Sequence, residues 1–284
     1  MKIDDVCRIF KEREADFMCP VCGASFHVSE QKNFVCTNNH CFDIAAKGYV
    51  NFIPNKKQIS EHYSKERFES RASVFESGVY DQVWREIHRI IQSKFGQEPK
   101  TNLLDVGCGE GYYAAKLSEV PGINVFAIDI IKDAILASCK KKAPVKWMVA
   151  DLANLPLRTG SIDVLLNILT SANYEEFKRV LSQDGIIIKV VPGNDYLKEI
   201  RELVKPQLRN QEYSNDSVVE YFEKHMKMIE KKTLYDKFPV DACVLKHFMQ
   251  MTPMAFGINT GNLDFNKVSE ITINLDILVG TVTQ

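Results

Sequence analysis

Short apolar runs alternate with amphipathic segments through the middle of the chain. The runs are almost continuously aliphatic, as is typical of strands that helices cover on both faces of a sheet. The amphipathic segments have the length of crossover helices, so the alternation predicts a mostly parallel sheet and an α/β fold. The expected strands are residues 103–106, 125–129, 147–152, 162–168 and 185–191, and the expected crossover helices are residues 110–119, 132–141 and 173–182.

Further elements flank this alternating region. Apolar residues recur at helical intervals from residue 68 to residue 95, with an interruption at Ser77 and Gly78. After the fifth run, Pro192 and Gly193 break the strand pattern. The remaining expected elements are a charged helix to about residue 208, an amphipathic helix over residues 215–230, a Met-rich apolar loop over residues 249–256 and a final strand over residues 271–282.

The first apolar run ends in a turn with three alternating glycines, Gly107, Gly109 and Gly111. Glycine adopts positive φ without strain and has no Cβ to block a ligand, and the following helix offers unpaired N–H groups. A nucleotide-like cofactor usually occupies such a turn at the carboxyl edge of a parallel sheet. The spacing matches neither the dinucleotide motif G-x-G-x-x-G nor the P-loop. Asp105 beside the turn would repel a pyrophosphate but suits a cofactor with a cationic end.

Two acids at strand ends follow the glycine turn. Asp129 closes the second run, roughly 20 residues after the turn, where a ribose-binding carboxylate belongs. We expect it to accept hydrogen bonds from the 2′ and 3′ hydroxyls of the cofactor, the alternative being a solvated strand end. Asp151 closes the third run and is expected to hold the adenine amino group while Leu152 packs on the ring.

A second motif lies near the start of the chain. Cys19 and Cys22 form one C-x-x-C knuckle, and Cys36 with either His40 or Cys41 forms another. Two such knuckles supply the four ligands of a tetrahedral zinc ion, which leaves no position for a substrate water and makes the metal structural. Free buried cysteines and disulfides are the alternatives. Residues 1–18 are dense in charge and do not resemble a signal peptide, so we expect a reducing compartment, the cytoplasm.

The composition bounds the domain organisation. The 284 residues are 45% hydrophobic and 26% charged, which is ordinary for a soluble protein with one large and one small domain. We expect a zinc module over residues 1–54, a linker and helical lead-in over residues 55–98, and a cofactor-binding domain over residues 99–284. No apolar run approaches the ~20 residues of a membrane helix. A formal charge of −1 argues against a non-specific polyanion binder, so any nucleic-acid site must be a local patch.

Together these motifs resemble the RlmA family of 23S rRNA guanine-N1 methyltransferases, and the glycine turn alone resembles motif I of the class I S-adenosylmethionine methyltransferases. The resemblance extends from about residue 17 to the end of the chain. Besides both knuckles and the turn, it rests on the segments 42–45 (Phe-Asp-Ile-Ala), 48–51 (Gly-Tyr-Val-Asn), 78–80 (Gly-Val-Tyr), 192–193 (Pro-Gly) and 251–253 (Met-Thr-Pro).

This resemblance implies a fold, an activity and partners. The fold would be a Rossmann-like methyltransferase with a mostly parallel seven-stranded sheet and a small N-terminal zinc module. The activity would be methyl transfer from S-adenosylmethionine to nitrogen-1 of a guanine in the hairpin-35 loop of 23S rRNA, with one structural Zn²⁺. The resemblance also favours a homodimer, whereas the expectation of no membrane partner comes from the lack of a membrane-length apolar run.

The resemblance also assigns roles to individual residues. The zinc ligands would be Cys19, Cys22, Cys36 and His40, which favours His40 over Cys41. Further cofactor contacts would come from Gly109 and Glu110 in the turn, from Tyr80 closing over the cofactor, and from Tyr196, which stands where a histidine is familiar.

The catalytic groups are less well defined by the sequence. No residue is identified as a general base, and Asn167 is expected to orient the purine. The Met-rich loop is expected to wall a base pocket, because methionine adapts to flat ligands. We also expect the zinc module to grip the RNA stem and aim its loop at the cofactor.

Two other classes of function remain open at this stage. A small-molecule methyltransferase would have an enclosed pocket and would act without RNA. A zinc-dependent RNA-binding or assembly protein would retain the cofactor fold only as a vestige, and it would bind no cofactor. A nicotinamide-dependent oxidoreductase ranks last, because the glycine spacing is wrong for it.

Overall fold

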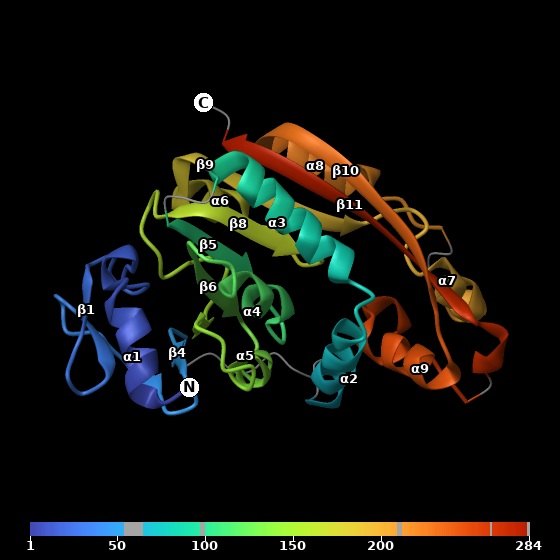
Figure 1. The fold of residues 1–284 in the computed structure, drawn as a ribbon, viewed down its shortest axis with the longest axis horizontal. Coiled ribbons are helices and arrows are strands. Elements are labelled where there is room, and N and C mark those ends of the chain that lie inside the picture. The colour runs from blue at the N-terminus through green and yellow to red at the C-terminus, as the bar shows by residue number, and fades with distance from the viewer. Residues whose placement is uncertain (54–64, 97–99, 209–211, 262, 283–284) are drawn as a thin grey trace.

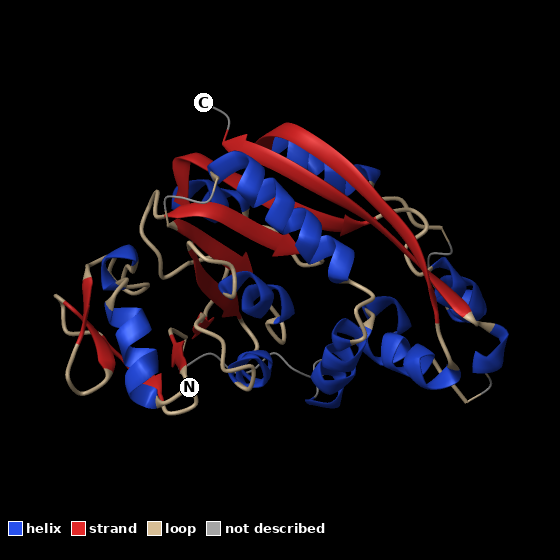
Figure 2. Cartoon of the chain, viewed as in Figure 1, coloured by secondary structure: helices blue, strands red, loops and turns tan. Residues whose placement is uncertain are grey.

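The computed structural model describes residues 1–53, 65–96, 100–208, 212–261 and 263–282. The strands of these parts form a continuous sheet, which helices cover on both faces (Figures 1 and 2). From one edge to the other the strands are β1 (Phe26–Val28), β2 (Asn33–Cys36), β3 (Cys41–Ala45), β4 (Tyr49–Asn51), β7 (Lys146–Val149), β6 (Ile123–Asp129), β5 (Thr101–Val106), β8 (Ile162–Ile168), β9 (Leu181–Pro192), β11 (Glu270–Val282) and β10 (Met226–Pro239).

The centre of the sheet is parallel, as the aliphatic runs predicted. Strands β7, β6, β5, β8 and β9 pair in parallel, and each overlaps one of the expected strands. The third expected strand was too long, because β7 ends at Val149 and not at residue 152. Strand β11 is antiparallel to both of its neighbours, β9 and β10. These strands are the seven of the expected methyltransferase sheet.

The zinc-bearing segment extends this sheet rather than standing apart from it. Strand β4 pairs in parallel with β7, with Tyr49 opposite Trp147 and Val50 opposite Met148. Strands β1 to β3 continue from β4 by antiparallel pairing. The Gly-Tyr-Val-Asn segment therefore supplies the strand that joins the first 53 residues to the methyltransferase sheet.

Helices pack on the two faces of the sheet in two clusters of buried residues. One face carries α2 (Lys65–Glu76), α3 (Asp81–Phe95), α4 (Tyr112–Ser118), α5 (Lys132–Cys139), α7 (Lys198–Val204) and α9 (Ala242–Met251), and the other carries α1 (Ile3–Lys11), α6 (Tyr174–Val180) and α8 (Asp216–His225). Successive residues of the central strands, such as Leu103 and Leu104, enter opposite clusters, as the alternation of side chains in a strand requires.

Phenylalanines form the contact between the zinc-bearing segment and the sheet. Phe17 packs against Phe34 with ring centroids 4.9 Å apart and against Phe126 of β6 at 5.6 Å. Phe52 adds a further ring, 6.3 Å from that of Phe17. All four side chains are almost completely buried, so the first 53 residues share a hydrophobic core with the methyltransferase sheet.

The crossover helices were predicted correctly, but two other expectations were wrong. The helix expected over residues 215–230 ends at His225, and the edge strand β10 begins at the next residue. The expected loop over residues 249–256 starts inside α9, which continues to Met251 before a short 3₁₀ helix. The break at Ser77 and Gly78 does separate α2 from α3. The first part of the expected linker, residues 55–64, lies outside the described residues, as does residue 54 at the end of the expected zinc module.

Length and hydropathy together distinguish the described helices from membrane-spanning helices. None combines the length and the apolar character needed to span a bilayer.

Candidate functional site

Four potential metal ligands converge beside β2. The ligand atoms of Cys19, Cys22, Cys36 and His40 all lie within 4.8 Å of one another. The sulfurs of Cys22 and Cys36 are 3.8 Å apart, and Nδ1 of His40 lies 3.4 Å from Sγ of Cys36. Tetrahedral zinc places its sulfur and nitrogen ligands about 3.5–3.8 Å apart. The donor set and its spacing therefore fit a structural zinc ion.

The position of Cys41 resolves the open choice of the fourth ligand. Cys41 is exposed at the start of β3 and is not part of the converging group, whereas His40 is. The thiol of Cys22 is prepared for metal binding, because a backbone hydrogen bond at Ala24 contributes most to lowering its pKa to about 6. The expected ligand set with His40 is thus confirmed.

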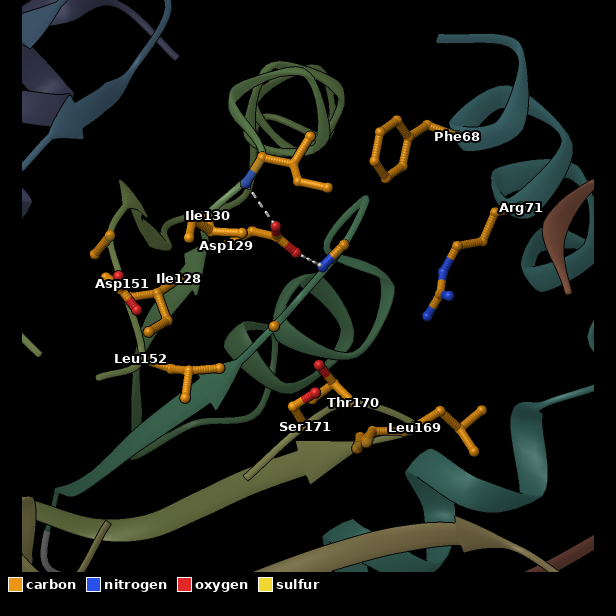
Figure 3. Close-up of a pocket in the computed structure, with 15 residues that line it drawn as sticks. Phe68, Arg71, Ile128, Asp129, Ile130, Asp151, Leu152, Leu169, Thr170 and Ser171 are labelled. Atoms are coloured by element: carbon orange, nitrogen blue, oxygen red, sulfur yellow. Dashed lines mark hydrogen bonds between the residues drawn. The ribbon is translucent and has the colours of Figure 1, made fainter. Parts of the chain in front are cut away.

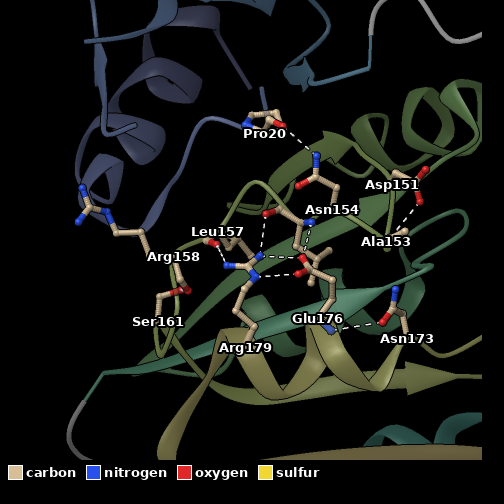
Figure 4. A network of polar contacts seen from close by, with 11 residues as sticks. Pro20, Asp151, Ala153, Asn154, Leu157, Arg158, Ser161, Asn173, Glu176 and Arg179 are labelled. Atoms are coloured by element: carbon tan, nitrogen blue, oxygen red, sulfur yellow. Dashed lines mark hydrogen bonds and ion pairs between the residues drawn. The ribbon is translucent and has the colours of Figure 1, made fainter. Parts of the chain in front are cut away.

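The first knuckle is fixed to the segment that follows β7 (Figure 4). The side-chain amide of Asn154 donates to the carbonyl oxygen of Pro20 at 2.8 Å. Arg158 reaches the other side of the knuckle, where its guanidinium donates to the hydroxyl of Ser25. Asp151 lies at the start of this same segment and also lines a pocket at the edge of the sheet. The segment after β7 therefore links the zinc site to that pocket.

A pocket of about 280 Å³ lies at the carboxyl ends of β5, β6 and β7 (Figure 3). The glycine turn lines the pocket on one side, and Phe68 and Arg71 of α2 line it on another (Figure 3). The lining residues are Phe68, Arg71, Gly107, Gly109, Ile128, Asp129, Ile130, Ile131, Ala150, Asp151, Leu152, Ile168, Leu169, Thr170 and Ser171. We call it the glycine-turn pocket.

The glycines of the turn have the conformation that the sequence predicted. Gly107, Gly109 and Gly111 have φ values of 70°, 57° and 74°, a region that residues with a Cβ rarely adopt. A Cβ on Gly107 would lie 2.6 Å from Oγ1 of Thr170, and one on Gly111 would lie 2.5 Å from the ring of Trp147. Gly107 thus leaves room at the pocket, and Gly111 allows the turn to pack on β7.

Asp129 lies on the pocket wall with both carboxylate oxygens held by backbone groups (Figure 3). Oδ2 accepts a hydrogen bond from the N–H of Gly109 at 3.0 Å, and Oδ1 accepts one from the N–H of Ile131 at 2.8 Å. Burial raises the pKa of Asp129, and these two N–H groups oppose the rise. Each oxygen keeps a lone pair that can accept a ribose hydroxyl.

Asp105 and Glu110 are buried behind the turn, each with 2% of its surface exposed. Oδ2 of Asp105 is a buried oxygen without a hydrogen-bond partner among the described atoms. Burial, together with the charge of Glu110, raises the pKa of Asp105 to about 7. An unsatisfied carboxylate oxygen in this place suits a cationic ligand, as a cofactor with an ammonium group and a sulfonium would provide.

The two tyrosines expected at the cofactor lie farther from the turn. The hydroxyls of Tyr80 and Tyr196 are 2.6 Å apart and hydrogen-bonded. Tyr80 is completely buried and stacks on Phe75 with ring centroids 4.6 Å apart. Neither lines the glycine-turn pocket, but Tyr196 lines a second, adjoining pocket.

This second pocket has a volume of about 800 Å³ and continues from the first. The two share Arg71 and the segment from Leu169 to Ser171 as a common wall. Met251, the last residue of α9, and Met254, in the 3₁₀ helix that follows, line the second pocket, as the sequence led us to expect. Aromatic residues line other parts of it, namely Phe75, Tyr174, Tyr196, Tyr213 and Tyr221.

Asn167 does not reach either pocket. Its side chain is completely buried, and its amide donates to the carbonyl oxygen of Ser171 at 2.8 Å. Its Oδ1 accepts a hydrogen bond from the amino group of Lys189. Lys189 itself lines the second pocket, so any effect of Asn167 on a bound base is indirect.

Sequence reasoning missed several residues of the two pockets. Arg71 and Phe68 come from α2, more than 30 positions before the turn, and Lys189 appeared only as part of an aliphatic strand. Arg71 carried no motif that marked it. A lysine within an otherwise apolar central strand is unusual and could have been singled out.

Comparisons with known proteins agree with this geometry. Residues 17–61 match the family model described as "RlmA, N-terminal", a zinc ribbon, and residues 104–189 match the model of the methyltransferase domain. The chain is 34% identical over 279 residues to "Putative 23S rRNA (guanine-N(1)-)-methyltransferase YxjB" of Bacillus subtilis (strain 168), which covers 93% of this chain and 96% of that protein. It is 24% identical to the 23S rRNA (guanine(748)-N(1))-methyltransferase of Streptomyces fradiae, which covers 92% and 95%.

These matches span nearly the whole chain and place the zinc ribbon and the methyltransferase domain in the order seen in the structure. The converging cysteines and histidine and the glycine-turn pocket are the sites that such a protein requires. The chain therefore belongs to the RlmA family of S-adenosylmethionine-dependent 23S rRNA (guanine-N1)-methyltransferases.

Proposed function

We propose that this protein transfers a methyl group from S-adenosylmethionine to nitrogen-1 of a guanine in the hairpin-35 loop of 23S rRNA. The observation that carries the proposal is the shared wall of the two pockets, formed by Arg71 and residues 169–171. A donor held in the first pocket and a base held in the second would meet across this wall. Such juxtaposition accounts for much of the catalysis of a group transfer.

The glycine-turn pocket would hold the cofactor, which supplies an electrophilic methyl group when bound. Asp129 would accept the ribose hydroxyls, and Asp151 with Leu152 would hold the adenine. The methionine end would lie over the turn formed by Gly107, Gly109, Glu110 and Gly111, with Asp105 behind it. Tyr80 would act through Tyr196, because its hydroxyl is bonded to that residue and is buried.

The second pocket would receive the target base. A guanine in an RNA loop must be unstacked before its Watson–Crick edge can meet a donor. The aromatic and methionine side chains of the pocket can stack on the extruded base. Its volume of about 800 Å³ leaves space for a nucleotide.

The zinc module would recognise the RNA. Its knuckles expose Val21, which is 62% exposed, and the run from Thr37 to Asn39. These tips lie on loops fixed by the metal and tied to the pocket wall through Asn154. A closed metal site has no chemistry of its own, so positioning the RNA is the role that fits it.

The proposed target can be tested by mapping methylation directly. Purified protein, S-adenosylmethionine and unmethylated 23S rRNA are incubated, and mass spectrometry of nuclease fragments locates the new methyl group. A methyl on nitrogen-1 of a hairpin-35 guanine is expected, and primer extension should stop there because the Watson–Crick edge is blocked. Methylation at another site would refute the target, and activity only on small metabolites would favour the alternative function.

The role of the zinc module requires point substitutions. Removing residues 1–55 would strip β4 from β7 and expose the phenylalanine cluster, so loss of activity would be uninformative. We expect Val21→Asp and Thr37→Asp to weaken RNA binding by charge repulsion with phosphate while leaving cofactor affinity unchanged. Ser93→Asp, an exposed position at the end of α3, is the matched control. Equal RNA affinity in all variants would contradict the role.

We also propose that the protein forms a homodimer. Strand β10 ends the sheet, and within the described residues only β11 pairs with it. Ile229 and Tyr235 on this strand are each 50% exposed. The strand thus offers both unpaired backbone groups and exposed apolar side chains, with which a second copy of the chain can pair. Light scattering should give about twice the chain mass of 32.4 kDa, and a monomer mass would refute the proposal.

A further inference from the structure

Lys189 is a buried lysine in the floor of the second pocket. Only 4% of its surface is exposed, and it lies in β9 opposite Asn167 of β8. Its amino group donates to Oδ1 of Asn167 and lies 3.4 Å from the carbonyl oxygen of Thr170. An ammonium group has three N–H donors, so these two contacts leave one donor for a ligand.

The two oxygen atoms that contact the ammonium group of Lys189 carry no formal charge, so they do not neutralise it. Both acceptors are neutral, and among the described residues Lys189 takes part in no ion pair with a carboxylate. Among the residues that the structure describes, no Asp or Glu lines the second pocket. Burying an uncompensated ammonium group is unfavourable, and desolvation lowers the pKa of Lys189 to about 8. Such a costly arrangement is typical of functional sites.

The place of this amino group matches the chemistry of guanine. Thr170, whose carbonyl oxygen it faces, belongs to the wall between the two pockets. We propose that Lys189 donates a hydrogen bond to O6 of the target guanine, selecting guanine and stabilising the charge on O6 as nitrogen-1 loses its proton. Adenine would present an amino group, itself a donor, to the same ammonium and would be rejected. This inference rests on the proposed function.

The reaction balances without a protein base. The bond between nitrogen-1 and the methyl carbon forms as the bond between that carbon and the cofactor sulfur breaks, and the sulfur keeps the electron pair. The proton of nitrogen-1 passes to water. An ammonium at O6 makes this proton more acidic, which explains how a pocket lined without carboxylates can promote its loss. Arg71, Arg201 and the pocket tyrosines are the other titratable groups that line it.

The chain contains a matched control for Lys189. Lys146 is also buried, with 3% exposed, and its amino group bonds to the amide oxygen of Asn124. Desolvation lowers its pKa to about 8 as well. It begins β7, at the amino ends of the parallel strands, whereas Lys189 lies at the carboxyl ends beside the pocket. Methionine replaces either side chain with little change of volume.

The test compares Lys189→Met and Lys146→Met in single-turnover methylation of 23S rRNA at saturating cofactor. We expect Lys189→Met to lower the rate at neutral pH about 100- to 1,000-fold, as for the loss of one preorganised donor, with cofactor affinity and melting temperature close to wild type. Lys146→Met should keep the wild-type rate. The deficit of Lys189→Met should shrink above pH about 8, where Lys189 loses its charge and guanine begins to ionise unaided.

Two results would overturn the inference. One is a wild-type rate in Lys189→Met, and the other is an equal loss at all pH values accompanied by a lower melting temperature, which would indicate a structural role. Failure of the proposed function has a different signature, because the wild-type protein itself would then methylate no guanine. A 6-thioguanine at the target site gives a second readout. Its sulfur is a weak acceptor, so Lys189→Met should lose less activity on it than on guanine.

Discussion

Nε of Arg71 lies 2.7 Å from Oε2 of Glu110, and this ion pair joins α2 to the glycine turn. The Glu110 side chain is 2% exposed and that of Arg71 is 26% exposed. Burial raises the pKa of both Asp105 and Asp129, and the charge of Arg71 opposes each rise. The charge of one guanidinium therefore opposes the burial of three carboxylates beside the glycine-turn pocket.

Replacing this arginine should destabilise the protein. Arg71→Met leaves Glu110 buried without its cation, and breaking a buried pair from one side typically costs about 3–5 kcal/mol. Because Arg71 is partly exposed, we expect a loss of about 2–4 kcal/mol in the free energy of unfolding. Urea denaturation of the protein without cofactor measures it.

Two further variants test the cause of that loss. Adding Glu110→Gln to Arg71→Met should recover part of the stability, because neighbouring residues couple. Arg89→Met is the control, since Arg89 is 49% exposed and its partner Glu86 keeps a second ion pair with Lys232. It should cost no more than about 1 kcal/mol. A double variant whose loss equals the sum of the single losses would contradict the pairing.

Stability should depend on the protonation of Asp105. Its pKa rises from 3.8 to about 7 because it is buried and close to Glu110. The folded protein thus binds this proton more tightly than the unfolded chain. The stabilisation is complete below pH 3.8 and is lost as the pH rises through about 7. We expect the free energy of unfolding to fall more steeply across this range in wild type than in Asp105→Asn, as measured by urea denaturation at several pH values.

Cofactor binding provides an independent check on Asp105. A cationic cofactor favours the ionised carboxylate, so binding near pH 6 should release a proton from wild type and fewer from Asp105→Asn. Calorimetry in buffers of different ionisation enthalpy measures the proton release. Parallel stability curves for the two proteins, or equal proton release, would show that Asp105 is already ionised.

The sequence alone predicted those parts of the site whose functional residues lie close together along the chain. The glycine turn, Asp129 and the cysteine knuckles are local patterns, and the aliphatic runs of a buried parallel sheet can be recognised without knowing their neighbours. The choice between His40 and Cys41 required geometry, because both stand at acceptable spacing from Cys36.

What the sequence did not reveal depends on contacts between distant segments. Strand β10 lacks a clear apolar alternation, because its more buried positions include Glu230 and Lys232, which pair with Arg89 and Glu86 of α3. The pairing of β4 with β7 joins residues almost 100 positions apart. Lys189 looked like one polar interruption in a strand until Asn167 and the pocket were placed around it.

The glycine turn should not tolerate a side chain at Gly107. Gly107→Ala combines a φ of 70° with a Cβ placed 2.6 Å from Oγ1 and 2.9 Å from Cγ2 of Thr170. Thr170 belongs to the wall between the pockets, so we expect cofactor affinity to fall at least about tenfold, equivalent to 1.4 kcal/mol. Gly160→Ala is the control, with a φ of 69° and open space around its Cβ. It should lose only about 1 kcal/mol of stability and no affinity. Equal affinities by calorimetry would refute the steric argument.

Loss of the zinc ion should affect the methyltransferase sheet as well as the ribbon. Cys36→Ser removes a ligand of the converging group, whereas Cys41→Ser alters an exposed thiol outside it. We expect Cys41→Ser to keep one zinc per chain and wild-type stability. Cys36→Ser should lose the metal and melt about 5–10 °C lower, corresponding to about 2–3 kcal/mol.

The sheet can be observed through Trp147, which lies opposite Tyr49 in the pairing of β4 with β7 and is 2% exposed. Trp84→Phe leaves Trp147 as the single tryptophan of the chain. In that background, a zinc chelator or Cys36→Ser should shift the emission of Trp147 to longer wavelength, because the ribbon that covers the β7 edge loosens and water reaches the ring. Unchanged emission after metal loss would show that the ribbon unfolds independently of the methyltransferase sheet. The pairing of β4 with β7 would then not couple the stability of the two parts.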